Sequence, residues 1–145
     1  MAPLRARCRS ERGAELVEFA LVLPVLLLIT CGIFDFGFLF QRYEVLTNAA
    51  REGARMASLP GYSETDVQNR VSAYLTAGGV PGAATTTRVF SSVTAGGRTF
   101  NVATVTVTYT YEYSFVGPIM SLFGSALTTV PLRAVAVMRV ESQGG

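Results

Sequence analysis

The sequence contains no histidine and no lysine, and all 12 of its basic residues are arginine. Without histidine the chain lacks the usual base of a nucleophilic relay, and without clustered carboxylates it offers no recognisable metal site. Its glycines form no GxGxxG pattern, and a phosphate-binding loop would also need a lysine. We therefore expect that the protein is not an enzyme and that it uses no cofactor or metal.

Charge of either sign is scarce, because only 15% of the 145 residues are charged whereas 50% are hydrophobic. From Ala14 onward eight arginines stand against nine Asp and Glu residues, so the formal net charge of +2 indicates no basic patch. We expect no nucleic-acid partner. The excess of arginine lies before the first apolar run, at Arg5, Arg7, Arg9 and Arg12.

That run contains no charged residue from Phe19 to Phe34, and its apolar character extends from Leu16 to Phe40. As a helix it would be about 37 Å long, against roughly 30 Å of hydrocarbon in a bilayer. The arginines before it place the N-terminus in the cytoplasm. We predict a basic leader at residues 1–13, a transmembrane helix at 14–40 and an outer domain at 41–145.

Two alternatives to a transmembrane helix share this layout. A cleaved secretory signal also combines basic, apolar and small residues, and the LITC sequence at Leu28–Cys31 approximates a lipobox. The other cysteine, Cys8, lies in the leader. The outer domain therefore has no cysteine for a disulfide and must be held together by packing.

Three residues complicate a plain anchor. Glu18 lies at the inner edge of the run and Asp35 close to its outer edge. A charged carboxylate costs on the order of 3 kcal/mol at the bilayer centre and less near an interface, so we expect both to reach water. Pro24 lacks an N–H for the carbonyl of Ala20, which makes the helix easier to bend.

Beyond the run the sequence predicts an α+β domain. The helix continues outward with a stripe of small residues, among them Gly53 and Ala54, which lets a neighbour approach closely. It ends at Pro60, and a second helix, capped by Ser63, follows. The remainder predicts an antiparallel sheet, with a hairpin turning at Ala95–Gly97, a loop or short helix at Pro118–Ala126 and a strand at Thr129–Glu141.

The second arm of the hairpin alternates strongly between Ala103 and Phe115. Its odd positions are apolar or aromatic, and we expect them to pack on the helix. Tyr109, Tyr111 and Tyr113 can instead form a binding stripe. This leaves open a different function, that of a single-pass membrane-anchored binding domain for an extracytoplasmic ligand.

The stretch RGAELVEFALVLPVLLL resembles the processing and assembly motif of type IV pilin-like proteins. The resemblance implies that a prepilin peptidase cuts between Gly13 and Ala14. It also implies that Glu18 pairs with the new amine of Ala14 on a neighbouring subunit, since either charge alone would be expensive in a poorly solvated place. Phe19 stands where major Flp pilins commonly carry tyrosine, which favours a minor pilin, and Pro24 would ease transfer out of lipid.

The stretch GIFDFGFLFQRYEVLTNAAREGARMAS closely resembles the TadE-like family of Tad (Flp) pilus assembly proteins. The resemblance implies a pilin-like fold and a minor pilin or pseudopilin that acts in pilus assembly and surface adherence. The implied partners are a prepilin peptidase, other pilins of the Tad system, inner-membrane platform proteins and a secretion ATPase. The implied location is the bacterial cytoplasmic membrane, with the outer domain extracytoplasmic. Gly53 and Ala54 of the AAREGAR segment are expected to pack against another subunit.

Overall fold

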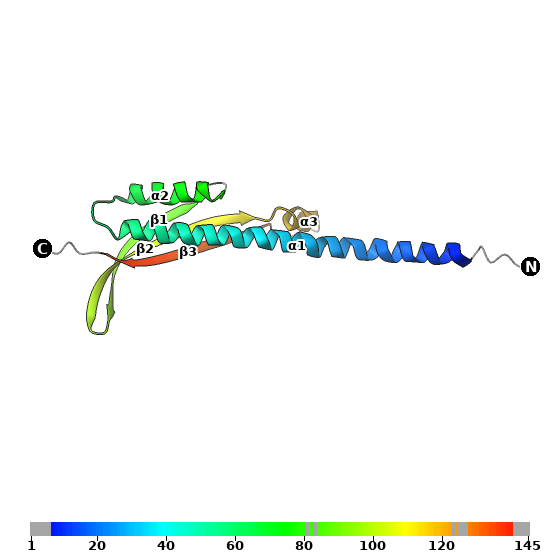
Figure 1. Cartoon of the computed structure of the whole chain (residues 1–145), viewed down its shortest axis with the longest axis horizontal. Coiled ribbons are helices and arrows are strands. Elements are labelled where there is room, and N and C mark those ends of the chain that lie inside the picture. Colours follow the sequence, from blue (N-terminus) through cyan, green and yellow to red (C-terminus); the bar gives the residue numbers. More distant parts are fainter. Residues whose placement is uncertain (1–6, 81, 83, 123, 125–127, 141–145) are drawn as a thin grey trace, which may run out of the picture.

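One helix, α1 (Arg7–Ala57), runs along the whole molecule, and the other elements gather around its C-terminal half (Figure 1). The computed structural model describes residues 7–80, 82, 84–122, 124 and 128–140, with side chains from residue 13 onward except that of Leu122. The other elements, in chain order, are α2 (Glu64–Ala77), β1 (Thr85–Ala95), β2 (Arg98–Glu112), α3 (Val116–Leu122) and β3 (Thr129–Arg139). The expected α+β fold with a long N-terminal helix is thereby confirmed.

The helix α1 continues without a break through Pro24 and through the predicted boundary between leader and transmembrane helix. It begins at Arg7, so part of the predicted leader is helical, while residues 1–6 lie outside the described residues. The outward continuation of the apolar helix, as far as Ala57, is also confirmed.

The second helix begins and ends where its local sequence predicts. The Ser63 hydroxyl accepts a 3.2 Å hydrogen bond from the backbone amide of Asp66, and the Asp66 carboxylate accepts one of 2.8 Å from the backbone amide of Ser63. This reciprocal pair satisfies two amides that an isolated helix end would leave free. The apolar stripe of Val67, Val71 and Leu75 is buried, and the helix stops at Gly78.

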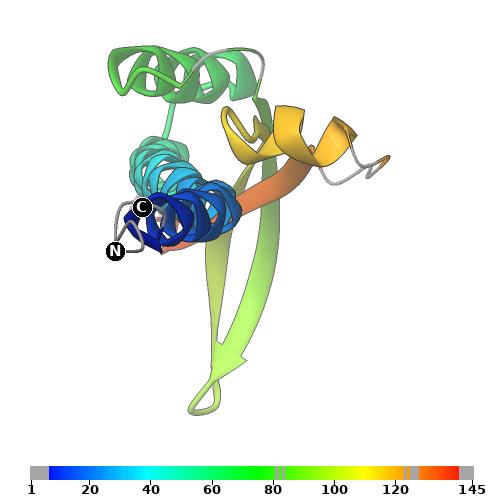
Figure 2. The ribbon, with the colours of Figure 1, turned by 90° about the vertical axis from the view of Figure 1, so that its right-hand side faces the viewer.

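The three strands form one antiparallel sheet in the order β1-β2-β3. The predicted hairpin is confirmed, and its turn is made by Gly96 and Gly97, whose φ values of 59° and 74° suit a tight hairpin turn. The strand β3 pairs with β2 only as far as Val102. The rest of the hairpin, residues 92–101, therefore projects beyond β3 as a two-stranded arm (Figure 2). We call these residues the hairpin arm.

The core lies where α1 and α2 meet one face of the sheet. Small residues of α1 bring its backbone close to the sheet, and the odd positions of β2 fill the space between them, as the alternation predicted. The opposite face of the sheet is exposed, including Val89, Val135 and Val137. The fully buried residues include Leu46, Ala49, Ala50, Ala54, Val67, Val71, Ala103, Val105 and Val107.

Candidate functional site

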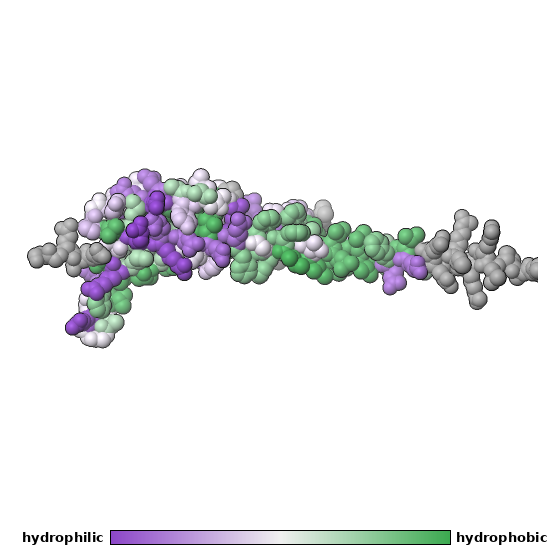
Figure 3. Space-filling view, in the orientation of Figure 1, coloured by the Kyte–Doolittle hydropathy of each residue, from purple (hydrophilic) through white to green (hydrophobic). Residues whose placement is uncertain are grey.

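The candidate site is the apolar half of α1, over most of which none of the other described residues packs. From Gly13 to Ala57 the helix is long and apolar enough, by length and composition, to cross a membrane. Its large apolar side chains are exposed, as Leu21 shows with 72% of its surface free. Figure 3 shows this surface as a continuous hydrophobic band between the N-terminal end and the folded domain. So much exposed apolar surface is typical of an interaction site rather than of a soluble surface.

The residues that the sequence predicts for processing and assembly all lie on this band. Gly13, Ala14, Glu18 and Phe19 are exposed, and Pro24 lies inside the helix. Among the described residues, apart from its own helical turn, a β-carbon built on Gly13 would meet no atom within 4 Å. The fold therefore places no steric demand on Gly13, and a requirement for glycine there would have to come from something that binds it.

Asp35 does not reach water, and that expectation was wrong. Only 1% of its surface is exposed. Its carboxylate accepts hydrogen bonds from the backbone amides of Ser114 at 2.9 Å, Phe115 at 3.0 Å and Val116 at 2.6 Å. Three donors compensate the loss of solvation, which is why a charged group can be buried in this place.

A second contact joins the same two segments. The Tyr111 hydroxyl donates a 3.2 Å hydrogen bond to the backbone carbonyl of Asp35. Burial raises the pKa of the Tyr111 phenol, and the nearby Asp35 carboxylate adds to the rise. We call Asp35, Tyr111 and the amides of residues 114–116 the Asp35 clasp. It fastens the chain that follows β2 to the apolar half of α1.

Gly53 and Ala54 lie in the core of their own chain. A β-carbon on Gly53 would lie 2.7 Å from Cγ2 of Val71 and 3.2 Å from Cγ1 of Val105, and Ala54 is fully buried. The close neighbours are thus α2 and β2, not a second subunit. The expected contact between subunits at these two residues does not match this arrangement, because the chain's own side chains cover them.

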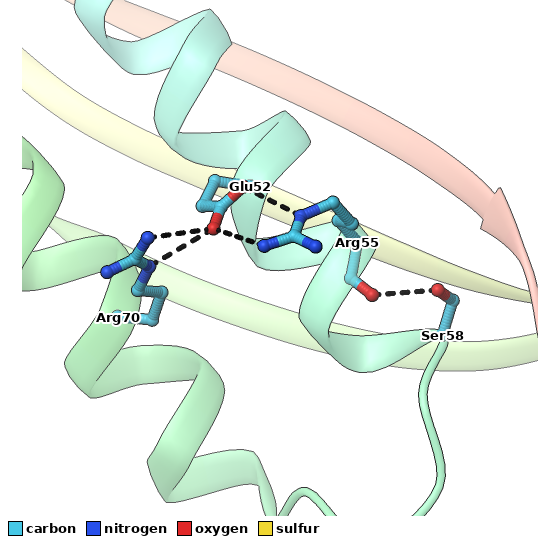
Figure 4. Close-up of polar contacts among 4 residues, drawn as sticks. All are labelled: Glu52, Arg55, Ser58 and Arg70. Carbon is cyan, nitrogen blue, oxygen red and sulfur yellow. Dashed lines mark hydrogen bonds and ion pairs between the residues drawn. The ribbon is translucent and has the colours of Figure 1, made fainter.

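The charged residues of the same segment tie α1 to α2 (Figure 4). The Glu52 carboxylate accepts hydrogen bonds of 3.0 Å from Arg55, one turn along α1, and of 2.9 Å from Arg70 of α2. These two guanidinium groups, Arg55 first, lower the pKa of Glu52 to about 2. The Ser58 hydroxyl donates to the carbonyl of Arg55 at 2.7 Å. This cluster serves the fold, and nothing in it resembles a catalytic arrangement.

The tyrosines of β2 belong to the core. Tyr109 and Tyr111 expose 9% and 4% of their surfaces, and the rings of Tyr111 and Tyr113 meet edge to face with centroids 5.5 Å apart. Aromatic pairs favour this arrangement inside proteins. The preference for core packing over a binding stripe is confirmed. The observation that suggested a ligand-binding domain is thereby removed.

Sequence reasoning missed the partners of Asp35, which lie 79 to 81 residues further along the chain. The available indications were a carboxylate at the edge of an apolar run and an uncharged segment after β2, but neither points to the other. Among the residues that the structure describes, no group of three or more Cys, Asp or Glu side chains is placed to hold a metal ion.

The structure thus combines an exposed apolar helix that could span a membrane with a small α+β domain on its C-terminal half, which is consistent with a membrane-anchored protein. Residues 13–55 match the family model described as TadE-like protein, so this segment is TadE-like. A match to this family implies a protein associated with the Tad pilus and its assembly machinery. Neither a curated protein nor a solved structure matches the chain.

Proposed function

We propose that the chain is a minor pilin or pseudopilin of a Tad (Flp) pilus that acts in pilus assembly and surface adherence. The observation that carries this proposal is the division of α1. Its first half is apolar and exposed, whereas its second half forms the core of a folded domain. A helix of this kind can serve first as a membrane anchor and then as the surface on which subunits pack.

In this proposal residues 1–13 form a cytoplasmic leader, 14–40 the anchor and 41–145 the extracytoplasmic domain. A prepilin peptidase cuts between Gly13 and Ala14, removes the leader arginines and frees the amine of Ala14. The exposed Glu18 then pairs with the Ala14 amine of another pilin. Pro24 leaves one carbonyl of the helix without its partner, which eases repacking when the subunit leaves the lipid. Platform proteins of the inner membrane and a secretion ATPase would drive that transfer.

Intact mass and N-terminal sequencing of the membrane-extracted protein test the processing step. The chain is produced in cells that carry the prepilin peptidase, as wild type, Gly13→Leu and Gly32→Leu. Neither Gly13 nor Gly32 has an atom within 4 Å of an added β-carbon, so both variants should fold alike. We expect an N-terminus at Ala14 in the wild type and in Gly32→Leu, and an uncut chain in Gly13→Leu.

Two other outcomes would contradict the proposal in different ways. A wild-type chain that stays uncut would make it an anchored protein that works from the membrane. A cut after Thr30 or beyond would instead indicate a lipoprotein or a secreted domain. If the cut lies between Gly13 and Ala14, the Glu18→Gln variant should be processed normally, but it should be absent from sheared pilus fractions.

A further inference from the structure

We propose that the segment between β2 and β3 is a second membrane contact, in which α3 lies in the interfacial layer of the outer leaflet beside the point where α1 leaves the bilayer. The contact is made by residues 113–121, here called the α3 segment. This inference rests on the proposed insertion of α1 and adds a surface that the family resemblance does not assign.

The level of the α3 segment along α1 is the first argument. Counted from Leu16, about 30 Å of helix, the thickness of the hydrocarbon layer, reaches Asp35. The Asp35 clasp holds the amides of Ser114, Phe115 and Val116 against that residue. The α3 segment is therefore fixed at the outer boundary of the hydrocarbon. Figure 1 shows α3 at the end of the folded domain that faces the apolar half of α1.

The chemistry of the α3 segment is the second argument. Its sequence, YSFVGPIMS, has no charged residue. Phe115 leaves 44% of its surface exposed, and its ring lies near that of the exposed Phe34, with centroids 6.3 Å apart. Ile119 and Met120 are half-buried. Phe and other apolar side chains are the ones that interfacial helices bury at the boundary between headgroups and acyl chains.

The continuity of the surface selects lipid as the occupant. The contact between Phe34 and Phe115 joins the α3 segment directly to the apolar band of α1, which the proposed function places in the lipid bilayer before assembly. An apolar patch far from that band would have suited a protein partner equally well. Here the patch begins where the band ends and lies at the same level, so one bilayer surface covers both.

The clasp explains how a carboxylate fits at this depth. Water would otherwise have to solvate both Asp35 and the three amides, and unsatisfied backbone groups are expensive near hydrocarbon. In the clasp the two sets of groups satisfy each other. The same bonds orient the backbone of Phe115, so that its ring stays beside Phe34 and does not turn into the core.

Depth-dependent fluorescence quenching tests the inference in the full chain. Cys8 and Cys31 are replaced by alanine, and a single cysteine carrying an environment-sensitive dye is placed at Ser121 of α3, at Ser72 of α2 or at Leu27 of the apolar band. Each protein is reconstituted in vesicles of phosphatidylcholine and phosphatidylglycerol that contain nitroxide lipids labelled near the headgroup or deep in the chain. We expect strong quenching at Leu27 by the deep label, at Ser121 by the shallow label, and little at Ser72.

The control at Leu27 separates failure of the inference from failure of the anchor. Quenching at Leu27 with no more at Ser121 than at Ser72 would refute the second contact and leave the anchor intact. Absence of quenching at Leu27 would refute both. Phe115→Glu should abolish the quenching at Ser121, whereas Val137→Glu, on the exposed face of β3, should leave it unchanged. Unchanged quenching in Phe115→Glu would also contradict the inference.

Discussion

Gly53 of α1 and Val71 of α2 approach so closely that a β-carbon on Gly53 would lie 2.7 Å from Cγ2 of the valine. Val105 of β2 closes the same gap from the sheet, at 3.2 Å. Helix, helix and strand thus converge on a residue that has no side chain. The small size of this residue, more than its flexibility, determines how tightly the domain packs.

Gly53→Ala should therefore destabilise the folded domain. Overpacking a tight core costs about 1 to 3 kcal/mol, and the gain in helix propensity returns at most about 1 kcal/mol. Thermal unfolding in detergent, followed by the near-ultraviolet circular dichroism of the buried tyrosines, measures the difference. The matched control is Gly37→Ala, because a β-carbon there meets nothing within 4 Å. A Gly53→Ala protein as stable as this control would contradict the packing.

The pair of arginines around Glu52 predicts a pH dependence of stability. The pKa of Glu52 is lowered from its ordinary value of 4.5 to about 2, first by Arg55 and then by Arg70. The stabilisation is complete above the ordinary value and is lost as the pH falls toward 2. Solvent screens the two largely exposed arginines, so we expect about 1 kcal/mol or less. The melting temperatures of the wild type and Glu52→Gln, measured from pH 6 down to pH 2, should converge at the acid end. A difference in melting temperature that stays constant over this range would show that the ionised cluster contributes nothing to stability.

Removing the Asp35 carboxylate should release the segment after β2. Asp35→Ala leaves the amides of Ser114, Phe115 and Val116 without acceptors. The loss should be on the order of 3 kcal/mol, as for buried groups deprived of a charged partner. Hydrogen exchange measured by mass spectrometry should show faster exchange across residues 113–121. Glu44→Ala, at an exposed position of the same helix, should exchange like the wild type; equal protection in both variants would mean that the clasp is not needed.

The cap of α2 predicts a smaller and more local effect. Hydrogen bonds from the Ser63 hydroxyl and backbone amide lower the pKa of Asp66. Ser63→Ala removes the hydroxyl and should cost about 1 kcal/mol, with faster exchange confined to the first turn of α2. The comparison variant is Ser72→Ala, in the exposed middle of the same helix. Equal stability of the two variants would show that the cap is dispensable.

The sequence predicted those elements whose determinants lie within a few residues. The cap at Ser63, the stripe that ends in Leu75 and the glycine turn of the hairpin are local signals, and the structure has all three. It did not predict which distant segments meet. The prediction for Asp35 used only its neighbours in the apolar run. Its hydrogen-bond donors follow β2 and are brought to it only when the sheet packs on α1.

Gly53 illustrates the same limit in a different way. A stripe of small residues predicts a close approach but does not say which element approaches. Here α2 and β2 occupy the space within one chain, so the small stripe is explained by folding. Whether such a small residue lies in the core or at an interface depends on which segment packs against it. The sequence pattern alone does not say which segment that is.

The unbroken course of α1 has a mechanical consequence. Because one continuous helix joins the apolar band to the core, a rotation of the helix about its axis beyond Pro24 also rotates the folded domain. The hairpin arm projects sideways from that axis, so the same rotation carries its tip around the helix (Figure 2). In the filament proposed above, the rotation of each helix about its axis would set the direction in which its hairpin arm points.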